Sequence, residues 1–63
     1  MNIHEAQAAL KQGKKLTHRY FTDDEWILQQ GIYIICEDGA QIEAEGFWKY
    51  RVSADWFNDW RVY

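Results

Sequence analysis

The chain has 63 residues, and its 10 acidic residues against 7 Lys and Arg give a net charge of −3. Hydrophobic residues make up 48% and aromatic residues 17% of the sequence, which excludes a disordered segment, because such segments lack the apolar surface that offsets chain entropy. A single Cys excludes an internal disulfide framework and a Cys-rich zinc site, and the acidic balance argues against a basic nucleic-acid-binding surface.

The first predicted element is a short amphipathic helix over residues 3–12. Asn2 is a suitable N-cap, and Glu5 follows it at the spacing of a capping box. Gly13 suits the position just after the end of a helix. Apolar residues recur along one face at Ile3, Ala6 and Leu10. A helix this short is marginal in water, so we expect it to pack on the rest of the chain.

From Lys14 the hydrophobic pattern takes a period of two, which predicts a strand. Its two faces carry Leu16, His18 and Tyr20 on one side and Lys15, Thr17 and Arg19 on the other. The polar segment 22–25 interrupts the pattern, and an apolar run resumes at Trp26. Gln30 and Gly31 suit a tight turn. The residues 32–36 then form the clearest strand, which is β-branched and expected to be covered on both faces.

Asp38-Gly39 is a strong hairpin signal and predicts that a further strand, residues 41–45, returns beside 32–36. Gly46 is expected to end that strand. Ser53 is expected to cap a single helical turn over 54–58, and residues 60–63 to form a closing strand. Trp60 and Val62 would then be a core pair on one face of the last strand.

These elements predict one α+β domain, residues 1–63, in which an N-terminal helix packs on a small antiparallel sheet of four to five strands. A short helical turn precedes the last strand. No run approaches the ~20 apolar residues that span a bilayer. The first residues lack the basic start and apolar stretch of a signal peptide, and we therefore expect a cytoplasmic protein without membrane contact.

The sequence offers no convincing catalytic or metal-binding set. Cys36 lies in an apolar run and is expected to be a small buried residue, because reactive thiols need accessible, electropositive surroundings. His4 and His18 lack the spacing of zinc ligands. The acidic run at residues 23–25 is most simply a solvated loop. We expect no catalytic residue, no metal and no cofactor.

The stronger signal is molecular recognition, because aromatic rings are interleaved with cations. Aromatic faces beside Arg suit a nucleobase or a phosphorylated nucleotide through stacking and bidentate contacts. The alternative is that each Trp belongs to the core or to a subunit interface, and that Lys49 and Arg51 are surface charges. The candidate binding residues are Arg19, Trp26, Trp48, Lys49, Tyr50, Arg51 and Asp55.

The small size also predicts self-association. One core in a chain of about 60 residues rarely supplies more than about 3–5 kcal/mol, and four Trp exceed what such a core usually encloses. We therefore expect a homo-oligomer, either a dimer or a tetramer. Asp55 and Asp59 flank the predicted helical turn, and they suit either turn positions or the acceptance of hydrogen bonds from ribose hydroxyls.

Both ends of the chain resemble a family of small phage proteins, the Thoeris anti-defence two family, some of whose relatives act as anti-CRISPR proteins. The opening, a helix followed by Gly13-Lys14-Lys15, a strand with Arg19 and then Trp26, is similar to the start of that family. The ending Asp59-Trp60-Arg61-Val62 is similar to its terminal pattern. The middle is shorter than in typical members.

The resemblance implies a non-enzymatic protein of a phage or prophage that acts in the host cytoplasm. Members of the family form homo-oligomers and hold a cyclic ADP-ribose-type immune signal, which starves the effector of that signal. On this hypothesis the phosphates are contacted by Arg19, Lys49 and Arg51. A base stacks on Trp26 or Trp48, and the Asp55 carboxylate accepts hydrogen bonds from ribose hydroxyls.

Two alternatives remain open from the sequence. The first is an anti-CRISPR or other inhibitor that binds a host defence protein directly, with an acidic strand face at Glu43 and Glu45, beside Glu37 and Asp38, imitating phosphate. The second is a small structural or interaction module. Charge-driven docking on a protein should weaken steeply with ionic strength, whereas binding of a buried, stacked ligand should weaken less.

Overall fold

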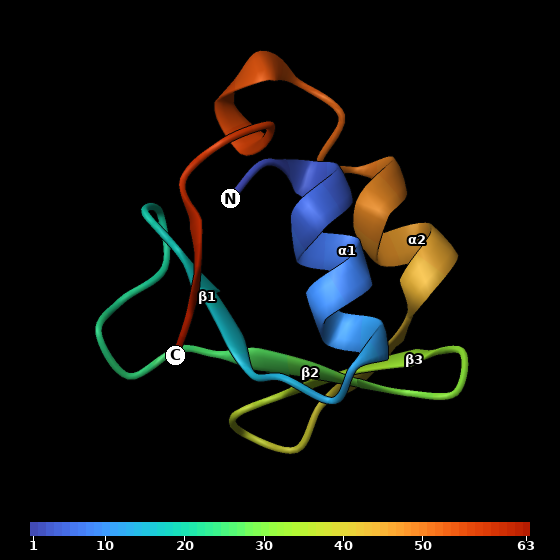
Figure 1. The fold of residues 1–63 in the computed structure, drawn as a ribbon. Helices are drawn as coiled ribbons and strands as arrows, with labels where there is room; N and C mark the ends of the chain where they lie inside the picture. Colours follow the sequence, from blue (N-terminus) through green and yellow to red (C-terminus); the bar gives the residue numbers. More distant parts are fainter.

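A computed structural model describes residues 1–63 and arranges them as two α-helices on one side of a five-stranded antiparallel sheet (Figure 1). The strand order is β4-β3-β2-β1-β5. The elements in chain order are α1 (Ile3–Lys11), β1 (Leu16–His18), β2 (Ile27–Gln30), β3 (Tyr33–Cys36), β4 (Gln41–Glu43), α2 (Ala44–Lys49), the 3-10 turn η1 (Ala54–Trp56) and β5 (Trp60–Val62). The predicted α+β class is confirmed. None of the helices has the length and apolarity that crossing a lipid bilayer requires.

Helix α1 has the termini that its sequence predicts. The Asn2 side chain accepts a hydrogen bond from the Glu5 N–H at 2.9 Å, and the Asn2 N–H donates to the Glu5 carboxylate at 2.9 Å. This reciprocal pair is a complete capping box. Gly13 follows the helix with a φ of +85°, a left-handed conformation that glycine adopts without a steric penalty. Ala6 and Leu10 face the sheet and are buried.

Strand β1 is shorter than the predicted strand, and its burial pattern differs. The chain turns after His18, because the Phe21 N–H donates to the His18 carbonyl, so Tyr20 leaves the strand and is 52% exposed. Thr17 was expected on the face opposite to Leu16, yet it is also buried. The segment before β2 covers it, and the Thr17 hydroxyl donates to the Glu25 carbonyl at 2.9 Å.

The two predicted hairpins are present. Strands β2 and β3 are joined at Gly31, and β3 and β4 are joined through Gly39, whose φ of +88° meets the requirement of a tight turn. The expectation that residues 32–36 are covered on both faces is wrong. Ile34 is fully buried on the helix side, whereas Ile32 lies in the turn and Tyr33 is exposed, because no helix covers the other face of the sheet.

The predicted strand over residues 41–45 ends early, which is the largest departure from the expected fold. Strand β4 stops at Glu43, and residues 44–49 form helix α2, with Gly46 inside the helix rather than at the end of a strand. The turn into α2 is fixed by the Ala44 N–H, which donates to the Ile32 carbonyl at 2.7 Å. The helix brings Phe47 into the core, where it is 2% exposed.

The core lies between the helices and the sheet. Trp60 is 1% exposed, as predicted, but its expected partner Val62, on the same edge strand, is 56% exposed. The helical turn before β5 covers only residues 54–56, and the Ser53 side chain does not cap it. Eight hydrophobic residues form the core: Ala6, Ala9, Leu10, Leu16, Ile27, Ile34, Phe47 and Trp60.

Candidate functional site

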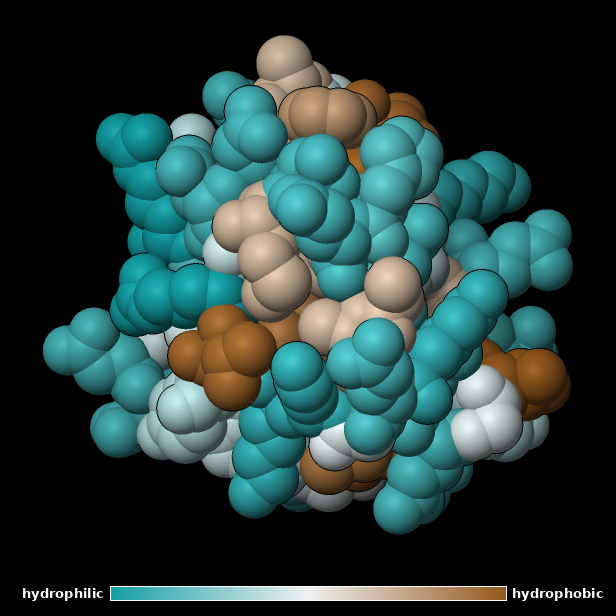
Figure 2. Space-filling view, in the orientation of Figure 1, coloured by the Kyte–Doolittle hydropathy of each residue, from teal (hydrophilic) through white to brown (hydrophobic).

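An open groove of about 720 Å3 lies where the start of α1 meets the start of β5. The surface seen in Figure 2 is mainly hydrophilic, with hydrophobic residues in separate patches, so a polar hollow is the main candidate for recognising a ligand. The groove is lined by Met1, Asn2, Glu5, Arg19, Asn58, Asp59, Trp60 and Arg61. We call these residues the β5 groove.

Backbone pairing fixes the walls of the β5 groove. The Met1 nitrogen donates to the Trp60 carbonyl at 2.6 Å, and the Trp60 N–H donates to the Met1 carbonyl at 3.2 Å. The Arg19 N–H donates to the Asp59 carbonyl at 3.3 Å. Segments from the beginning, the first third and the end of the chain are therefore held together as one surface.

Two arginine side chains that could bind an acidic ligand, Arg19 and Arg61, line the groove. Arg19 and Asp59 form the one ion pair of the structure, with 3.7 Å between Arg19 Nη1 and Asp59 Oδ2, and both side chains are more than half exposed. Such an exposed pair contributes about 0–1 kcal/mol to stability, so a ligand can displace it at little cost. Arg61 has no carboxylate partner within 4 Å and is free to bind an anion.

Asp59 adopts a left-handed backbone with a φ of +73° and is the only residue other than glycine to do so. Asp tolerates this conformation better than most residues, but it remains an uncommon one. The conformation turns the chain into β5 and sets the Asp59 carboxylate and carbonyl beside Arg19. A local strain is thus held at the groove wall.

His18 lies directly behind the groove and is 1% exposed. The Tyr20 N–H donates to His18 Nδ1 at 3.1 Å, so Nε2 carries the hydrogen and donates to the Asn58 carbonyl at 2.7 Å. The imidazole lies 4.6 Å from the rings of both Trp56 and Trp60, measured between centroids. Burial lowers the pKa of His18, which favours the neutral ring that these two hydrogen bonds require.

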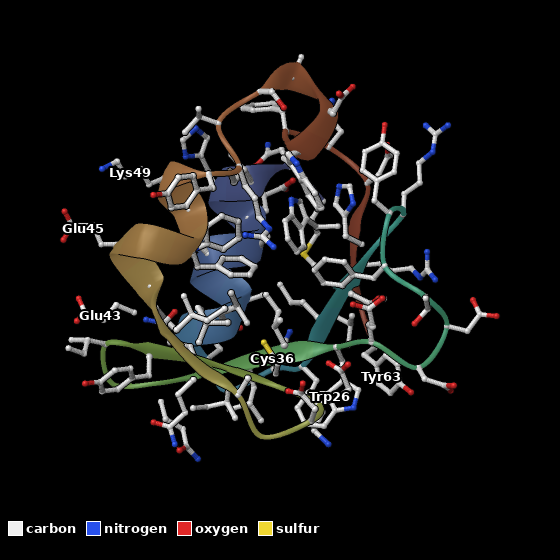
Figure 3. The ribbon with its side chains drawn as sticks, turned by 180° about the vertical axis from the view of Figure 1, so that it is seen from behind. Trp26, Cys36, Glu43, Glu45, Lys49 and Tyr63 are labelled. Carbon is white, nitrogen blue, oxygen red and sulfur yellow. The ribbon has the colours of Figure 1, made fainter.

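The predicted binding residues do not gather in one site. Arg19 alone is in the β5 groove. Trp26 is on the sheet face that no helix covers, where Lys15 Nζ lies 4.2 Å from its ring and the Tyr63 ring lies 6.3 Å away. Figure 3 shows Trp26 and Tyr63 together at this end of the sheet. Lys49 and Tyr50 are exposed at the end of α2, and Asp55 is exposed on η1.

Trp48 and Arg51 belong to the aromatic packing beneath η1. The Arg51 guanidinium lies 3.8 Å from the Phe47 ring centroid and 5.1 Å from that of Trp56, and its Nη1 donates to the Phe47 carbonyl at 3.1 Å. Burial lowers the pKa of Arg51, and its Nε is buried without a hydrogen-bond partner. Arg51 therefore fills space between aromatic rings. Trp48 packs on Trp60 and also lines a smaller pocket of about 230 Å3 between the helices.

Two further expectations concern Cys36 and the acidic strand face. Cys36 is half-buried against the core, and burial raises the pKa of its thiol, as expected of an unreactive cysteine. The prediction that Glu43 and Glu45 share an acidic strand face is wrong. Glu43 is the last residue of β4, whereas Glu45 is on α2 (Figure 3). No three His, Cys, Asp or Glu side chains are close enough to hold a metal ion.

The binding residues predicted from the sequence do not include Asn58 and Arg61, and Asp59 appears there only as one of two carboxylates that suit ribose. The available signal was the pair Asn58-Asp59 before the last strand, because these residue types favour left-handed turns. Comparison with known proteins adds no assignment: no protein-family model, curated protein or solved structure matches this chain.

Proposed function

We propose that this protein binds and sequesters a small nucleotide-derived signal of the cyclic ADP-ribose type without catalysis, as a counter-defence protein of a phage or prophage in the host cytoplasm. The observation that carries the proposal is the β5 groove, which presents two guanidinium groups on a chain of net charge −3. The resemblance of both chain ends to the Thoeris anti-defence two family supports the class of ligand.

The groove residues have the chemistry that a diphosphate linkage needs. Guanidinium groups bind phosphate through two parallel N–H donors, which gives affinity and orientation together. We assign the phosphates to Arg19 and Arg61. The role first given to Lys49 and Arg51 passes to Arg61, because Lys49 and Arg51 lie outside the groove.

Carboxylates in the same groove suit ribose. Glu5 and Asp59 line it, and ionised carboxylates accept hydrogen bonds from sugar hydroxyls. Of the two carboxylates that the sequence suggested for ribose, Asp59 lines the groove and Asp55 does not, so we assign this role to Asp59. The Asp59 carboxylate also holds Arg19 in the absence of a ligand, which prepares the guanidinium for an anion.

The ring of a base can stack on Trp26 or Tyr63, whose rings lie close together. Arg61 is on β5 and Tyr63 follows the end of that strand two residues later, where the extended chain keeps both side chains on the same side of the sheet. The Tyr63 N–H donates to the Lys15 carbonyl at 2.9 Å, so Lys15 and Trp26 lie close to Tyr63. Stacking on an aromatic side chain contributes about 1–3 kcal/mol per base.

Sequestration needs only affinity and stoichiometry, because no transition state has to be stabilised. Homo-oligomers would raise the number of sites per particle, and we retain the expectation of a dimer or tetramer as part of the proposal. A homo-oligomer could also enclose the open groove, which would exclude water from the bound ligand.

Titration calorimetry with ADP-ribose tests the proposal. We expect wild-type protein to bind it and Arg61→Ala to weaken binding by about 10- to 100-fold, since charged hydrogen bonds contribute about 1.5–3 kcal/mol. Lys14→Ala is the matched control, because Lys14 is an exposed cation outside the groove. Absence of ADP-ribose binding, or equal affinity of Arg61→Ala and wild type, would refute the assignment of the groove.

A further inference from the structure

The hydrogen bonds of His18 connect the two strands of chain that form one wall of the β5 groove. Through Nδ1 the ring holds the Tyr20 N–H, next to Arg19 in the turn after β1. Through Nε2 it holds the Asn58 carbonyl, next to Asp59 in the turn before β5. Arg19, Asn58 and Asp59 all line the groove, so the position of this wall depends on one imidazole.

Protonation of that imidazole is incompatible with the bond at Nδ1. An imidazolium carries hydrogen on both nitrogens, so Nδ1 can no longer accept from the Tyr20 N–H, and two donors would face each other at 3.1 Å. The Asn58 bond survives protonation, because Nε2 donates in either state. Movement of the turn that carries Arg19 and Tyr20 would separate the two donors.

The surroundings of the ring favour its neutral state on balance. The Asp59 carboxylate and the Asn58 carbonyl favour the imidazolium, whereas burial and the guanidinium groups of Arg19 and Arg51 oppose it. Burial is the largest of these influences and lowers the pKa of His18. The ring is enclosed by Trp56 and Trp60, so water cannot solvate an added charge.

We propose that His18 is a proton-operated latch of the β5 groove: the neutral ring holds the Arg19 turn in its anion-binding position, and protonation releases the turn and the ligand. This inference rests on the proposed function for the ligand, but the latch itself can be observed in the protein alone. It makes ligand retention dependent on pH in a site whose anion-binding Arg residues stay charged throughout.

Nuclear magnetic resonance on 15N-labelled protein between pH 7.5 and 5 tests the latch without any ligand. We expect the His18 ring to titrate below the ordinary histidine value of 6.5, and the Tyr20 amide to shift and lose protection from hydrogen exchange with the same midpoint. The control is His4→Asn, which removes the other histidine, an exposed residue outside the groove, and the Tyr20 amide should shift in this variant as it does in wild type. Protonation of His18 with an unmoved Tyr20 amide would overturn the proposal.

The second test measures ADP-ribose affinity at pH 7.5 and 5.5. Both phosphate protons of ADP-ribose are strongly acidic, so its charge stays constant and a change in affinity belongs to the protein. We expect at least about a fivefold loss of affinity at the lower pH in wild type and in His4→Asn, and little loss in His18→Asn. By the same linkage, bound ADP-ribose should lower the midpoint of the His18 titration.

The outcomes separate the latch from the proposed function. Equal or higher affinity at pH 5.5 would overturn the latch and leave the binding proposal intact, because the added charge would then attract the anion without moving the turn. No ADP-ribose binding at either pH would refute the proposed function, while the Tyr20 amide would still decide whether His18 controls the turn. If His18→Asn fails to fold, the wild-type titration and the reciprocal shift of the His18 midpoint carry the test.

Discussion

The substitution Trp60→Phe tests whether the fold depends on one tryptophan at the junction of core and groove. Trp60 is 1% exposed, packs on His18 and Trp48, and donates from Nε1 to the Trp56 carbonyl at 2.8 Å. Phe has three fewer side-chain heavy atoms, one of them this nitrogen. Two lost buried carbons correspond to about 1.6 kcal/mol, at about 0.8 kcal/mol each. The lost hydrogen bond adds about 1 kcal/mol.

We therefore expect Trp60→Phe to lower the free energy of unfolding by about 2–3 kcal/mol, a large share of the about 3–5 kcal/mol that a core of this size supplies. The midpoint of thermal unfolding should fall by at least about 8 °C. Urea unfolding followed by circular dichroism measures the change. Trp26→Phe is the matched control and should cost less than about 1 kcal/mol, because Trp26 is half-buried and its indole N–H makes no hydrogen bond. Equal costs at Trp60 and Trp26 would refute the assignment of the core.

Three further predictions concern stability. The His18 contribution to the free energy of unfolding should be constant above about pH 7, fall as the pH drops from 6.5 to the lowered pKa of folded His18, and level off below it, because the unfolded chain takes up the proton first. Urea titrations between pH 5 and 8 measure this, and a flat profile would contradict the neutral His18. Asn2→Ala should cost about 1 kcal/mol by removing the bond to the Glu5 N–H, whereas Gln7→Ala on the same helix should be nearly neutral. Arg51→Met should change the free energy of unfolding by less than about 1 kcal/mol, because the methionine side chain can fill the space beside the Phe47 ring. Arg51→Ala should cost about 1–3 kcal/mol, because that packing is lost. Equal costs for the two Arg51 variants would show that its charge matters more than its packing.

Local signals predicted the elements whose ends are determined by their own residues. The capping box at Asn2 and the left-handed Gly13 define α1, and Gly39 defines the hairpin of β3 and β4. Helix α2 could not be predicted in this way, because Gln41 to Glu45 alternates as a strand does. What overrides the alternation is tertiary: α2 brings Phe47 into the core, and the Ile32 carbonyl receives the Ala44 N–H.

The candidate site was harder to predict, because it depends on register. Arg19 and Arg61 share the groove because β1 and β5 pair with Thr17 opposite Arg61, a long-range pairing that no local pattern specifies. The same pairing sets His18 opposite Trp60 and explains why a histidine on an apolar face is buried. Arg51 had the right chemistry for a phosphate, but its stacking on Phe47 can be recognised only once α2 is known.

The most direct test of the central claim is to incubate the protein with ADP-ribose, remove free ligand, denature the protein and identify what is released. A ligand at 100 times its dissociation constant adds about 2.7 kcal/mol of stability, which should raise the thermal midpoint by about 10 °C or more before release. We expect ADP-ribose to be retained and recovered intact, with retention lost in Arg61→Ala. Recovery of cleaved ligand would contradict sequestration and indicate an enzyme, and failure to retain ADP-ribose would contradict the groove as its binding site.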